Sequence, residues 1–302
     1  MSADTGKSFS SGFVAIAGRP NVGKSSLLNH FVGHKISITS RRPQTTRNRL
    51  LGICTEKDSQ IVFVDTPGIH SNQKKALNRV INKTATGSLE GVDLIIMMIT
   101  ASGWIEEDRF VYEKVAATGV PAILVINKVD TLKERDRLLP LMQGIDADTD
   151  FLEIVPVSVK SGYNMKHLYD VLVANLPEGP PGFPEDQITD RSQRFLAGEL
   201  VREKMFRHLG EELPYTSAVE ISRFELDANG TAHIDATIWV EKPGQKAIVI
   251  GKNGLSLKRI GQRAREEMER LFQRKVYLEC WVKVRKGWTN DAQVMKSLGY
   301  DE

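Results

Sequence analysis

Hydrophobic and polar positions alternate in two ways along the first 176 residues. Short apolar runs, typical of buried strands, alternate with longer segments whose apolar residues recur every three to four positions, as on one face of a helix. The expected strands are residues 14–17, 50–56, 61–65, 94–100, 122–126 and 154–157. One expected helix begins at Lys24, and the others lie near residues 75–89, 106–117, 132–144 and 164–174. This alternation predicts an α/β domain with a doubly wound, mostly parallel sheet.

The pattern changes after residue 176. Residues 176–184 contain four prolines and two glycines, a composition typical of a linker. Residues 191–209 then repeat apolar residues with a helical period, and residues 219–226 and 232–240 alternate as the strands of a hairpin. A helix (255–272) and a strand (276–286) are expected to follow. We therefore expect an N-terminal tail (1–11), a first domain (12–176), a linker (177–190) and an α+β second domain (191–302).

Composition narrows the class of protein. The chain has 302 residues, 41% of them hydrophobic, which is enough for two packed cores. Cys54 and Cys280 match no metal-binding or redox spacing, and the polar N-terminus lacks the apolar segment of a signal peptide. The longest apolar runs are too short to span a bilayer. These features predict a protein of the reducing cytoplasm.

Charge is distributed unevenly along the chain. The net charge is only +3, but residues 251–286 contain eleven Lys and Arg against four Asp and Glu. A local excess of cations of this kind favours a nucleic-acid partner for the second domain.

The first candidate for chemistry lies between an expected strand and an expected helix. It fits the phosphate-binding pattern G-x-x-x-x-G-K-[ST] with the residues Gly18, Arg19, Pro20, Asn21, Val22, Gly23, Lys24 and Ser25. The two glycines let backbone N–H groups surround a polyphosphate, and the start of the helix adds the positive end of its dipole. We expect Lys24 to reach the terminal phosphates and Ser25 to ligate Mg²⁺.

Two further motifs, each after an expected strand, select the nucleotide. One fits N-K-x-D with Asn127, Lys128, Val129 and Asp130. The carboxylate of Asp130 can accept two hydrogen bonds from guanine, and adenine offers no such pair of donors. The other fits D-x-x-G with Asp65, Thr66, Pro67 and Gly68. We expect Asp65 to hold Mg²⁺ through water and the Gly68 N–H to contact the γ-phosphate, so GTP or GDP is the predicted ligand.

Residues 35–49 carry five basic residues and no acid. A GTPase keeps its nucleotide-sensing loop at this position, so we expect Thr46, or else Thr45, to complete the Mg²⁺ site. A solvated basic loop is the simpler alternative. After the last strand, Ser158 lies where a base-contacting S-A-K loop is expected, although Val159 departs from that pattern.

Catalysis is less well defined by the motifs. Ile69 follows D-x-x-G where many small GTPases have a glutamine that orients water, and Ile69 cannot polarise water. One alternative is that GTP is only structural and is not hydrolysed at a useful rate. If GTP is hydrolysed, Asn21 is expected to bind a potassium ion that neutralises charge on the phosphates. Asn21 could equally have only a structural role in bracing the turn. The expected contributors to catalysis are Lys24, Asn21, Thr46 and Gly68.

The second domain contains a nucleic-acid motif between two expected helices. The segment from Gly251 to Gly254 fits the G-x-x-G clamp of a KH domain, in the element order of the second (type II) KH topology. Its glycines allow a strand to approach the backbone, and nearby cations suit phosphates. Single-stranded RNA is the expected partner, and a protein-docking module is the alternative. The expected RNA contacts are Ile250, Gly251, Lys252, Asn253, Gly254, Lys258 and Arg259.

Taken together, the chain resembles the Era GTPases. The resemblance rests on G-R-P-N-V-G-K-S at 18–25, Q-T-T-R at 44–47, D-T-P-G at 65–68, N-K-V-D at 127–130 and I-G-K-x-G at 250–254. It covers nearly the whole chain. It implies a GTP-hydrolysing ribosome-assembly protein that binds the 3′ end of small-subunit ribosomal RNA through its KH domain. It also implies peripheral association with the inner membrane, and we expect a monomer.

Overall fold

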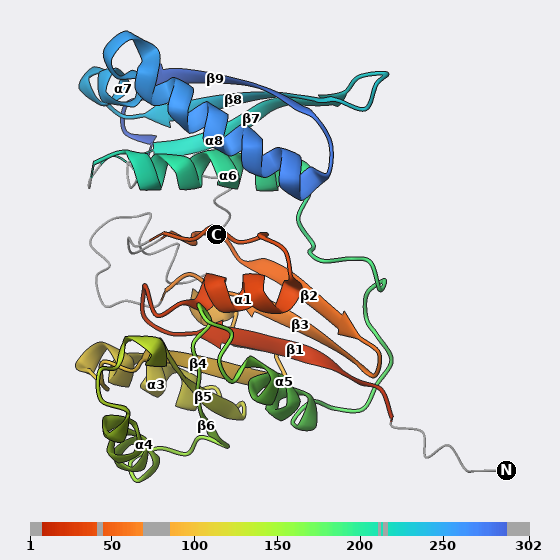
Figure 1. The fold of residues 1–302 in the computed structure, drawn as a ribbon, viewed down its shortest axis with the longest axis vertical. Coiled ribbons are helices and arrows are strands. Elements are labelled where there is room, and N and C mark those ends of the chain that lie inside the picture. Colours follow the sequence, from red (N-terminus) through yellow and green to blue (C-terminus); the bar gives the residue numbers. More distant parts are fainter. Residues whose placement is uncertain (1–7, 41–44, 69–84, 211–212, 214–216, 289–302) are drawn as a thin grey trace, which may run out of the picture. The chain divides into compact units, whose positions relative to one another are not determined.

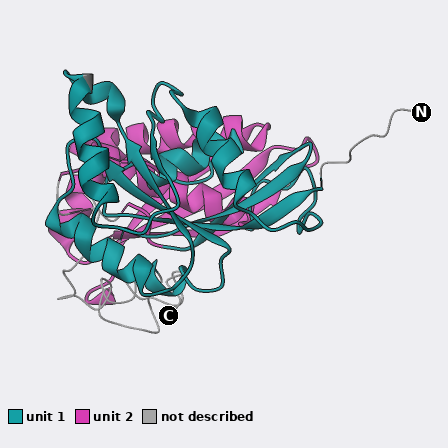
Figure 2. Cartoon of the chain, turned by 90° about the horizontal axis from the view of Figure 1, so that it is seen from below, with its two compact units in different colours: residues 1–37, 48–73, 81–190 teal, residues 38–47, 74–80, 191–302 magenta. Residues whose placement is uncertain are grey.

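The chain forms two compact units in a computed structural model that describes residues 8–40, 45–68, 85–210, 213 and 217–288. The first unit comprises residues 1–37, 48–73 and 81–190, and the second comprises residues 38–47, 74–80 and 191–302 (Figure 2). The division differs from a simple cut in the sequence, because residues 38–47 group with the second unit. This segment contains part of the predicted nucleotide-sensing loop.

The first unit is built on a six-stranded sheet with the order β2-β3-β1-β4-β5-β6 (Figure 1). Among the described strands of this sheet only β2 runs antiparallel to its neighbour, which confirms the doubly wound, mostly parallel α/β prediction. The strands are β1 (Ser10–Ala17), β2 (Leu50–Glu56), β3 (Ser59–Asp65), β4 (Leu94–Thr100), β5 (Ala122–Asn127) and β6 (Ile154–Pro156). The helices are α1 (Lys24–Val32), α3 (Glu106–Ala116), α4 (Leu138–Asp146) and α5 (Met165–Ala174).

The apolar runs become the centre of this sheet because parallel strands are covered on both faces. Every residue of β3, β4 and β5 is buried. Alternate β4 residues join a core cluster that includes Val111 and Val115 of α3 and Ile145 of α4. On α1, Phe31 stacks against Phe63 of β3, with ring centroids 5.1 Å apart. Rigid packing on both sides fixes the carboxyl ends of the strands, where the motifs lie.

Two helix predictions differ from the structure or fall outside it. Helix α4 begins at Leu138, whereas the sequence predicts a start near residue 132. An earlier start would put Pro140 in the helix interior, where its ring clashes and it donates no hydrogen bond, while in the first turn it is tolerated. The helix predicted near 75–89 lies mostly outside the described residues, and residues 85–87 are helical.

The proline-rich linker is held against the first unit by hydrogen bonds. The Ile53 N–H donates to the carbonyl of Ile188, and the Leu51 N–H donates to the side chain of Asp190. Gln60 of β3, fully buried, accepts hydrogen bonds from the Gly182 and Phe183 N–H groups at 2.8 and 2.9 Å. The linker therefore covers the outer edge of β2, which would otherwise expose unpaired backbone groups.

Among its described residues, the second unit packs three helices on one face of a three-stranded sheet (Figure 1). Strands β7 (Ser217–Leu226) and β8 (Ala232–Val240) form the predicted hairpin, and β9 (Val276–Val284) pairs parallel to β8. The helices are α6 (Gln193–His208), α7 (Pro243–Ile250) and α8 (Leu255–Phe272). Alternate residues of β8 are buried with Ile260, Ala264 and Met268 of α8. The order of elements is that of the predicted type II KH fold.

None of the helices in the described part of the chain is long and apolar enough to cross a membrane.

Candidate functional site

The predicted phosphate loop joins β1 to α1 and depends on its glycines. Gly18 has φ 146°, and a side chain there would meet the carbonyl oxygen of Met98 at 2.6 Å. Gly23, at φ 115°, immediately precedes the helix. These left-handed conformations favour glycine and turn the backbone back on itself. The loop therefore ends with helix N–H groups free of intrahelical partners, the arrangement that binds phosphate.

Lys24 is held inside this loop. Its ammonium group donates to the carbonyl oxygens of Gly18 at 2.8 Å and Arg19 at 3.1 Å, and only 7% of the residue is exposed. Burial lowers the pKa of Lys24 to about 8, opposed by the nearby Asp65 carboxylate and assisted by the Arg19 charge. An anionic phosphate would supply the negative charge that this buried cation favours.

Asp65 lies at the carboxyl end of β3 and is completely buried. The hydroxyl groups of Ser25 and Ser37 both donate to its Oδ2 atom, at 2.9 and 2.7 Å. Its Oδ1 atom has no hydrogen-bond partner among the described residues. Burial raises the pKa of Asp65, and Ser37, Lys24 and Ser25 oppose the rise. A buried carboxylate oxygen beside a serine hydroxyl is a donor set that suits Mg²⁺ or its bound water.

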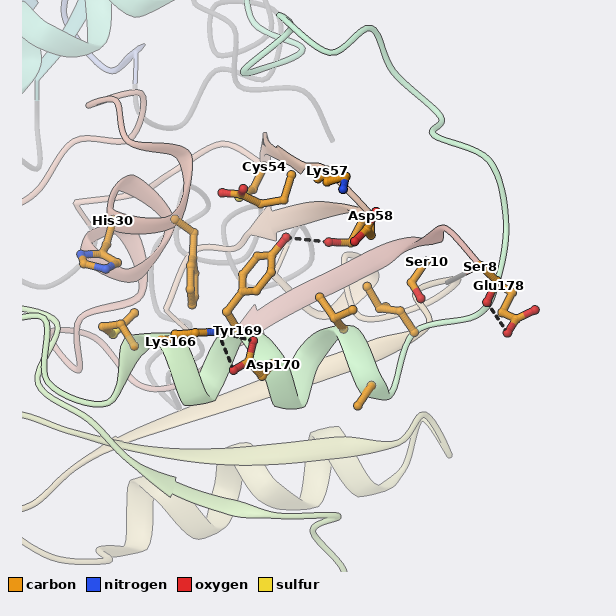
Figure 3. A pocket seen from close by; sticks show the side chains of 17 residues that line it. Ser8, Ser10, His30, Cys54, Lys57, Asp58, Lys166, Tyr169, Asp170 and Glu178 are labelled. Carbon is orange, nitrogen blue, oxygen red and sulfur yellow. Dashed lines mark hydrogen bonds and ion pairs between the residues drawn. The ribbon is translucent and has the colours of Figure 1, made fainter. Parts of the chain in front are cut away.

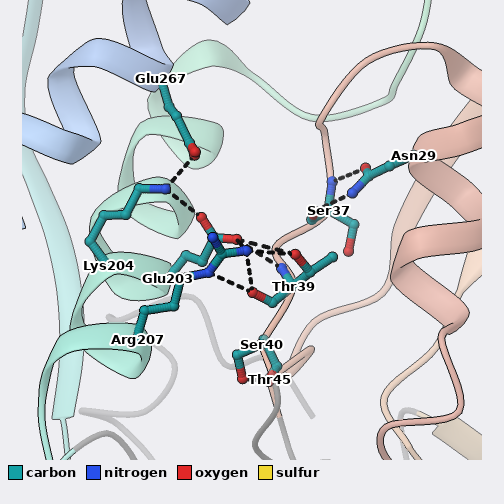
Figure 4. A network of polar contacts seen from close by, with 9 residues as sticks. All are labelled: Asn29, Ser37, Thr39, Ser40, Thr45, Glu203, Lys204, Arg207 and Glu267. Atoms are coloured by element: carbon teal, nitrogen blue, oxygen red, sulfur yellow. Dashed lines mark hydrogen bonds and ion pairs between the residues drawn. The ribbon is translucent and has the colours of Figure 1, made fainter. Parts of the chain in front are cut away.

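Ser37 is a site residue that sequence reasoning missed. It lies next to Asp65 because Asn29 of α1 holds its backbone: the Asn29 side chain accepts from the Ser37 N–H at 2.9 Å and donates to the Ser37 carbonyl at 2.7 Å (Figure 4). No motif marks either residue, since the contact depends on how the chain turns after α1.

Arg19 makes a second set of contacts that the sequence does not predict. Its guanidinium donates to Asp108 at 3.0 Å and to the Thr100 hydroxyl at 3.0 Å. Asp108 is fully buried and also accepts from the Ile105 N–H at the start of α3. Burial raises the pKa of Asp108, and Arg19 opposes this. The ion pair ties the phosphate loop to a helix far away in the sequence.

The D-x-x-G motif continues from Asp65 along the phosphate loop. Thr66 donates from its hydroxyl to the Ile16 carbonyl of β1 at 2.8 Å. A side chain at Gly68 would lie 3.0–3.1 Å from Pro20 atoms, so glycine lets the two loops meet. Pro67 separates Thr66 from Gly68 in the sequence, and Ile69 is outside the described residues.

The N-K-x-D segment and the loop after β6 meet at the end of β5. Asn127 donates from its amide to the Val22 carbonyl at 2.8 Å and accepts from the Lys128 and Val159 N–H groups. The Ser158 hydroxyl donates to Asp130 Oδ1 at 2.6 Å. The other carboxylate oxygen of Asp130 therefore stays available to a nucleotide base. Ser158 orients Asp130 through its side chain.

A hydrogen bond joins Lys128 of the N-K-x-D segment to Asn21 of the phosphate loop. The Lys128 ammonium donates to the backbone carbonyl of Asn21 at 2.6 Å, and both residues adopt φ 66°. Burial lowers the pKa of Lys128, with Arg19 adding to the effect and Asp130 opposing it. Val129 starts the short 3-10 turn that positions Asp130. The phosphate and base motifs thus form one connected loop cluster.

Thr45 and Thr46, expected near Mg²⁺, lie in the second unit with residues 38–47. There the Arg202 side chain of α6 donates to the Thr45 carbonyl at 2.7 Å. Glu203, fully buried, accepts from the Thr39 N–H at 3.1 Å and pairs with Lys204 at 2.8 Å (Figure 4). In this structure Thr39 and Thr45, two residues of the predicted sensing loop, contact α6.

The G-x-x-G segment forms the expected clamp between α7 and α8. Gly251 has φ 73°, and a side chain there would meet Ser256 at 2.6 Å. Asn253 and Gly254 also adopt positive φ, so the loop turns sharply. Lys252, Asn253, Lys258 and Arg259 are exposed, and Ile250 is half-buried. The clamp therefore combines a sharply turned backbone with exposed cations.

A glycine-bounded phosphate loop, a buried carboxylate beside it and an N-K-x-D segment, in a chain that also folds a G-x-x-G turn, are typical of a GTPase domain joined to a KH domain. The family models agree: residues 13–128 match a 50S ribosome-binding GTPase and residues 212–289 match a KH domain.

Full-length relatives narrow this class. GTPase Era from Stenotrophomonas maltophilia (strain R551-3) is 55% identical over 290 residues, covering 96% of this chain and 97% of the relative. GTPase Era from Actinobacillus pleuropneumoniae serotype 3 is 50% identical over 289 residues, covering 96% and 95%. The chain belongs to the Era family of GTPases.

Two solved structures share the whole fold. One is a variant of Aquifex aeolicus Era bound to GDP and AlF₄⁻, and the other is Era with MgGDPNP and nucleotides 1506–1542 of 16S ribosomal RNA. Each has a TM-score of 0.94 and 41% identity, covering 97% of this chain and 100% of the other.

Proposed function

We propose that this protein binds and hydrolyses GTP with Mg²⁺ and binds the 3′ part of small-subunit ribosomal RNA during ribosome assembly. The observation that carries the proposal is the meeting of Lys24, Ser25, Asp65 and Asp130 in one loop cluster of a chain with a G-x-x-G clamp. Complexes of Era relatives with GDP and AlF₄⁻, with MgGDPNP and with 16S ribosomal RNA support it.

The comparisons name two different ribosomal subunits. The family model for the GTPase domain is named for the 50S subunit but covers residues 13–128 only. The Era structure with 16S RNA, a component of the small subunit, aligns with 97% of this chain. The small subunit is therefore the better-supported partner.

The chain's own residues would divide the work as follows. Ser25 and Asp65 hold Mg²⁺, which offsets the negative charge of the phosphates. Lys24 neutralises terminal phosphate oxygens, and the Gly68 N–H contacts the γ-phosphate. Thr46, or else Thr45, is the proposed further ligand of Mg²⁺. Asp130, oriented by Ser158, selects guanine.

Potassium is the proposed second ion, and Asn21 is its proposed ligand. The support is the place of Asn21 in the phosphate loop and the lack of a water-orienting glutamine at position 69. Initial phosphate release should be faster in potassium chloride than in sodium chloride, and Asn21→Ala should remove the difference with nucleotide affinity little changed. Equal rates in both salts would leave Asn21 a structural residue.

RNA binding tests the second domain. Replacing Lys252 and Asn253 by Asp puts two anions where phosphates should lie, so RNA affinity should be lost while basal GTP hydrolysis stays intact. For the parent protein, log affinity against log salt should have a slope of about −3 for a four-nucleotide clamp. Single-turnover hydrolysis with and without RNA separates a hydrolytic switch from structural GTP.

Location and assembly state complete the proposal. Family resemblance supports a monomer of the cytoplasm that contacts the inner membrane peripherally. Sedimentation of the purified chain and flotation with anionic vesicles test these two points.

A further inference from the structure

The first unit has a large groove on the side away from the phosphate loop. It measures about 1160 Å³ and is bounded by α1, the β2–β3 hairpin and α5 (Figure 3). Ser10 and Ser59, the first residues of β1 and β3, line it. Parallel strands start at one edge and end at the other, and the nucleotide motifs follow the strand ends. The groove is therefore separate from the GTP site.

Aromatic rings form the floor of this groove. Tyr169 rises from α5 toward the hairpin, where its hydroxyl lies 2.8 Å from the Ser59 hydroxyl (Figure 3). Its ring centroid lies 6.0 Å from that of Phe31, and both rings are only half-buried. Both residues line the groove, although one face of the Phe31 ring is covered by Phe63. The exposed face of an aromatic ring attracts cations such as the side chains of arginine and lysine.

Carboxylates dominate the rim. Four acids line the groove against two lysines, a local formal charge of −2 in a chain of +3: Glu56, Asp58, Asp170 and Glu178 against Lys57 and Lys166. Lys166 is already paired with Asp170 at 2.9 Å. Glu56 and Asp58, both exposed, have no ion-pair partner among the described residues. The rim therefore disfavours RNA and anionic lipid and favours a cation.

We propose that this groove is a docking surface for a basic protein segment, with lysine or arginine side chains facing Glu56 and Asp58 and lying over Tyr169. Its volume exceeds that of most small-molecule sites, about 300–1,000 Å³, and suits several residues of an extended peptide. The proposal rests on the proposed function in one respect: the segment belongs to a protein of the small ribosomal subunit.

Photo-crosslinking identifies the occupant directly. Lys57→p-benzoylphenylalanine places a reactive group on the hairpin turn of the full-length chain. Irradiation with purified small subunits and GTP should join it to a lysine- and arginine-rich segment of a subunit protein. The same group at Glu113, exposed on α3, is the control and should not give this product. Crosslinks to RNA, to a second copy of this chain, or to nothing would overturn the proposal.

Charge reversal measures the contribution of the rim. Glu56→Lys combined with Asp58→Lys should weaken binding to small subunits at least tenfold, with GTP hydrolysis and affinity for a short ribosomal RNA strand unchanged. Glu113→Lys should match the parent protein in all three assays. Unchanged subunit binding by the double variant would refute a basic partner. If the parent protein and Glu113→Lys both fail to bind subunits, the assembly role itself is wrong, and the groove has no partner on the subunit.

Discussion

At the scale of single residues, the nucleotide site contains two ionisable side chains whose charges the protein compensates only in part. Lys24 and Asp65 are both buried, and burial shifts the pKa of each toward its neutral form. Folding therefore retains these charges at a cost in stability. Such a cost is expected where side chains serve binding rather than packing.

Lys24→Met should stabilise the protein when no nucleotide is present. The folded pKa of Lys24 is about 8, against 10.5 for the free side chain, so at pH 7 its burial costs about 3 kcal/mol. Between pH 8 and 10.5 the unfolded chain binds the extra proton, so parent stability rises with pH and the advantage of the variant shrinks. Urea unfolding of both proteins across this pH range measures the difference.

The control for this prediction is the liganded protein. With MgGTP the order should reverse, because ligand binding stabilises only a chain that binds it. A variant less stable than the parent at pH 7 without nucleotide would show that the hydrogen bonds from Lys24 to the loop outweigh its burial.

We expect Asp130 to select the base. Asp130→Asn replaces an acceptor by an amide, so GTP should bind more weakly by about 1.5–3 kcal/mol. Xanthosine triphosphate, which carries oxygen at C2, should bind more tightly. Ser158 can still contact the amide, so the fold should be kept. Titration of the parent protein and the variant with both nucleotides measures the two affinities. An unchanged affinity of Asp130→Asn for GTP would contradict the role of Asp130 in base selection.

The sequence predicts those site residues that belong to a local motif. It does not predict those that reach the site through tertiary contacts. The spacing of Gly18, Lys24 and Ser25 is enough to predict a phosphate loop. Nothing near Ser37 or Asp108 marks them, because each reaches its partner through the packing of a whole helix or strand.

At the scale of elements, helix α6 holds a segment that the sequence assigns to the nucleotide site. Glu203 accepts from the Thr39 N–H and pairs with Lys204 and Arg207. Periodicity predicts the helix from its apolar residues, but it gives no hint that this helix buries a carboxylate. The same limit explains α4, whose start depends on Pro140 rather than on the apolar pattern.

Glu203→Ala should release residues 38–40 from α6. Lys204, almost fully buried, would keep only Glu267 as its ion-pair partner within the described part of the chain. Removing one member of a buried pair costs about 3–5 kcal/mol. Hydrogen exchange at the Thr39 amide should accelerate by at least tenfold, while Glu134→Ala, which removes an exposed pair, should leave it unchanged. Equal protection in both variants would mean that other contacts hold the segment.

At the scale of the whole molecule, the linker is an ordered part of the first unit. Its proline content predicts a boundary, but its hydrogen bonds to Leu51, Ile53 and Gln60 could not be read from composition. The distribution of charge is also hidden by the overall composition. The groove of the first unit is acidic, while residues 251–286 are strongly basic. The small net charge conceals two surfaces suited to different partners.

Gln60→Ala should loosen the linker and lower stability by about 1–3 kcal/mol. The Gly182 and Phe183 N–H groups and the Phe183 carbonyl would lose their partner. Hydrogen exchange at these two amides should rise in the variant. Gln143→Ala, at an exposed position of α4, is the matched control. If Gln60→Ala leaves both amides protected, the linker is held by its other contacts alone.

The separation of the acidic groove from the nucleotide site by the length of β3 matters for the design of inhibitors. The strand begins at Ser59 in the acidic groove and ends at Asp65 in the nucleotide site, about 20 Å away for a strand of this length. A cationic, peptide-sized inhibitor that occupied the groove would not compete directly with GTP. Its potency would be the same whatever the cellular GTP level, and it would also spare other GTPases that share the phosphate loop but lack this groove.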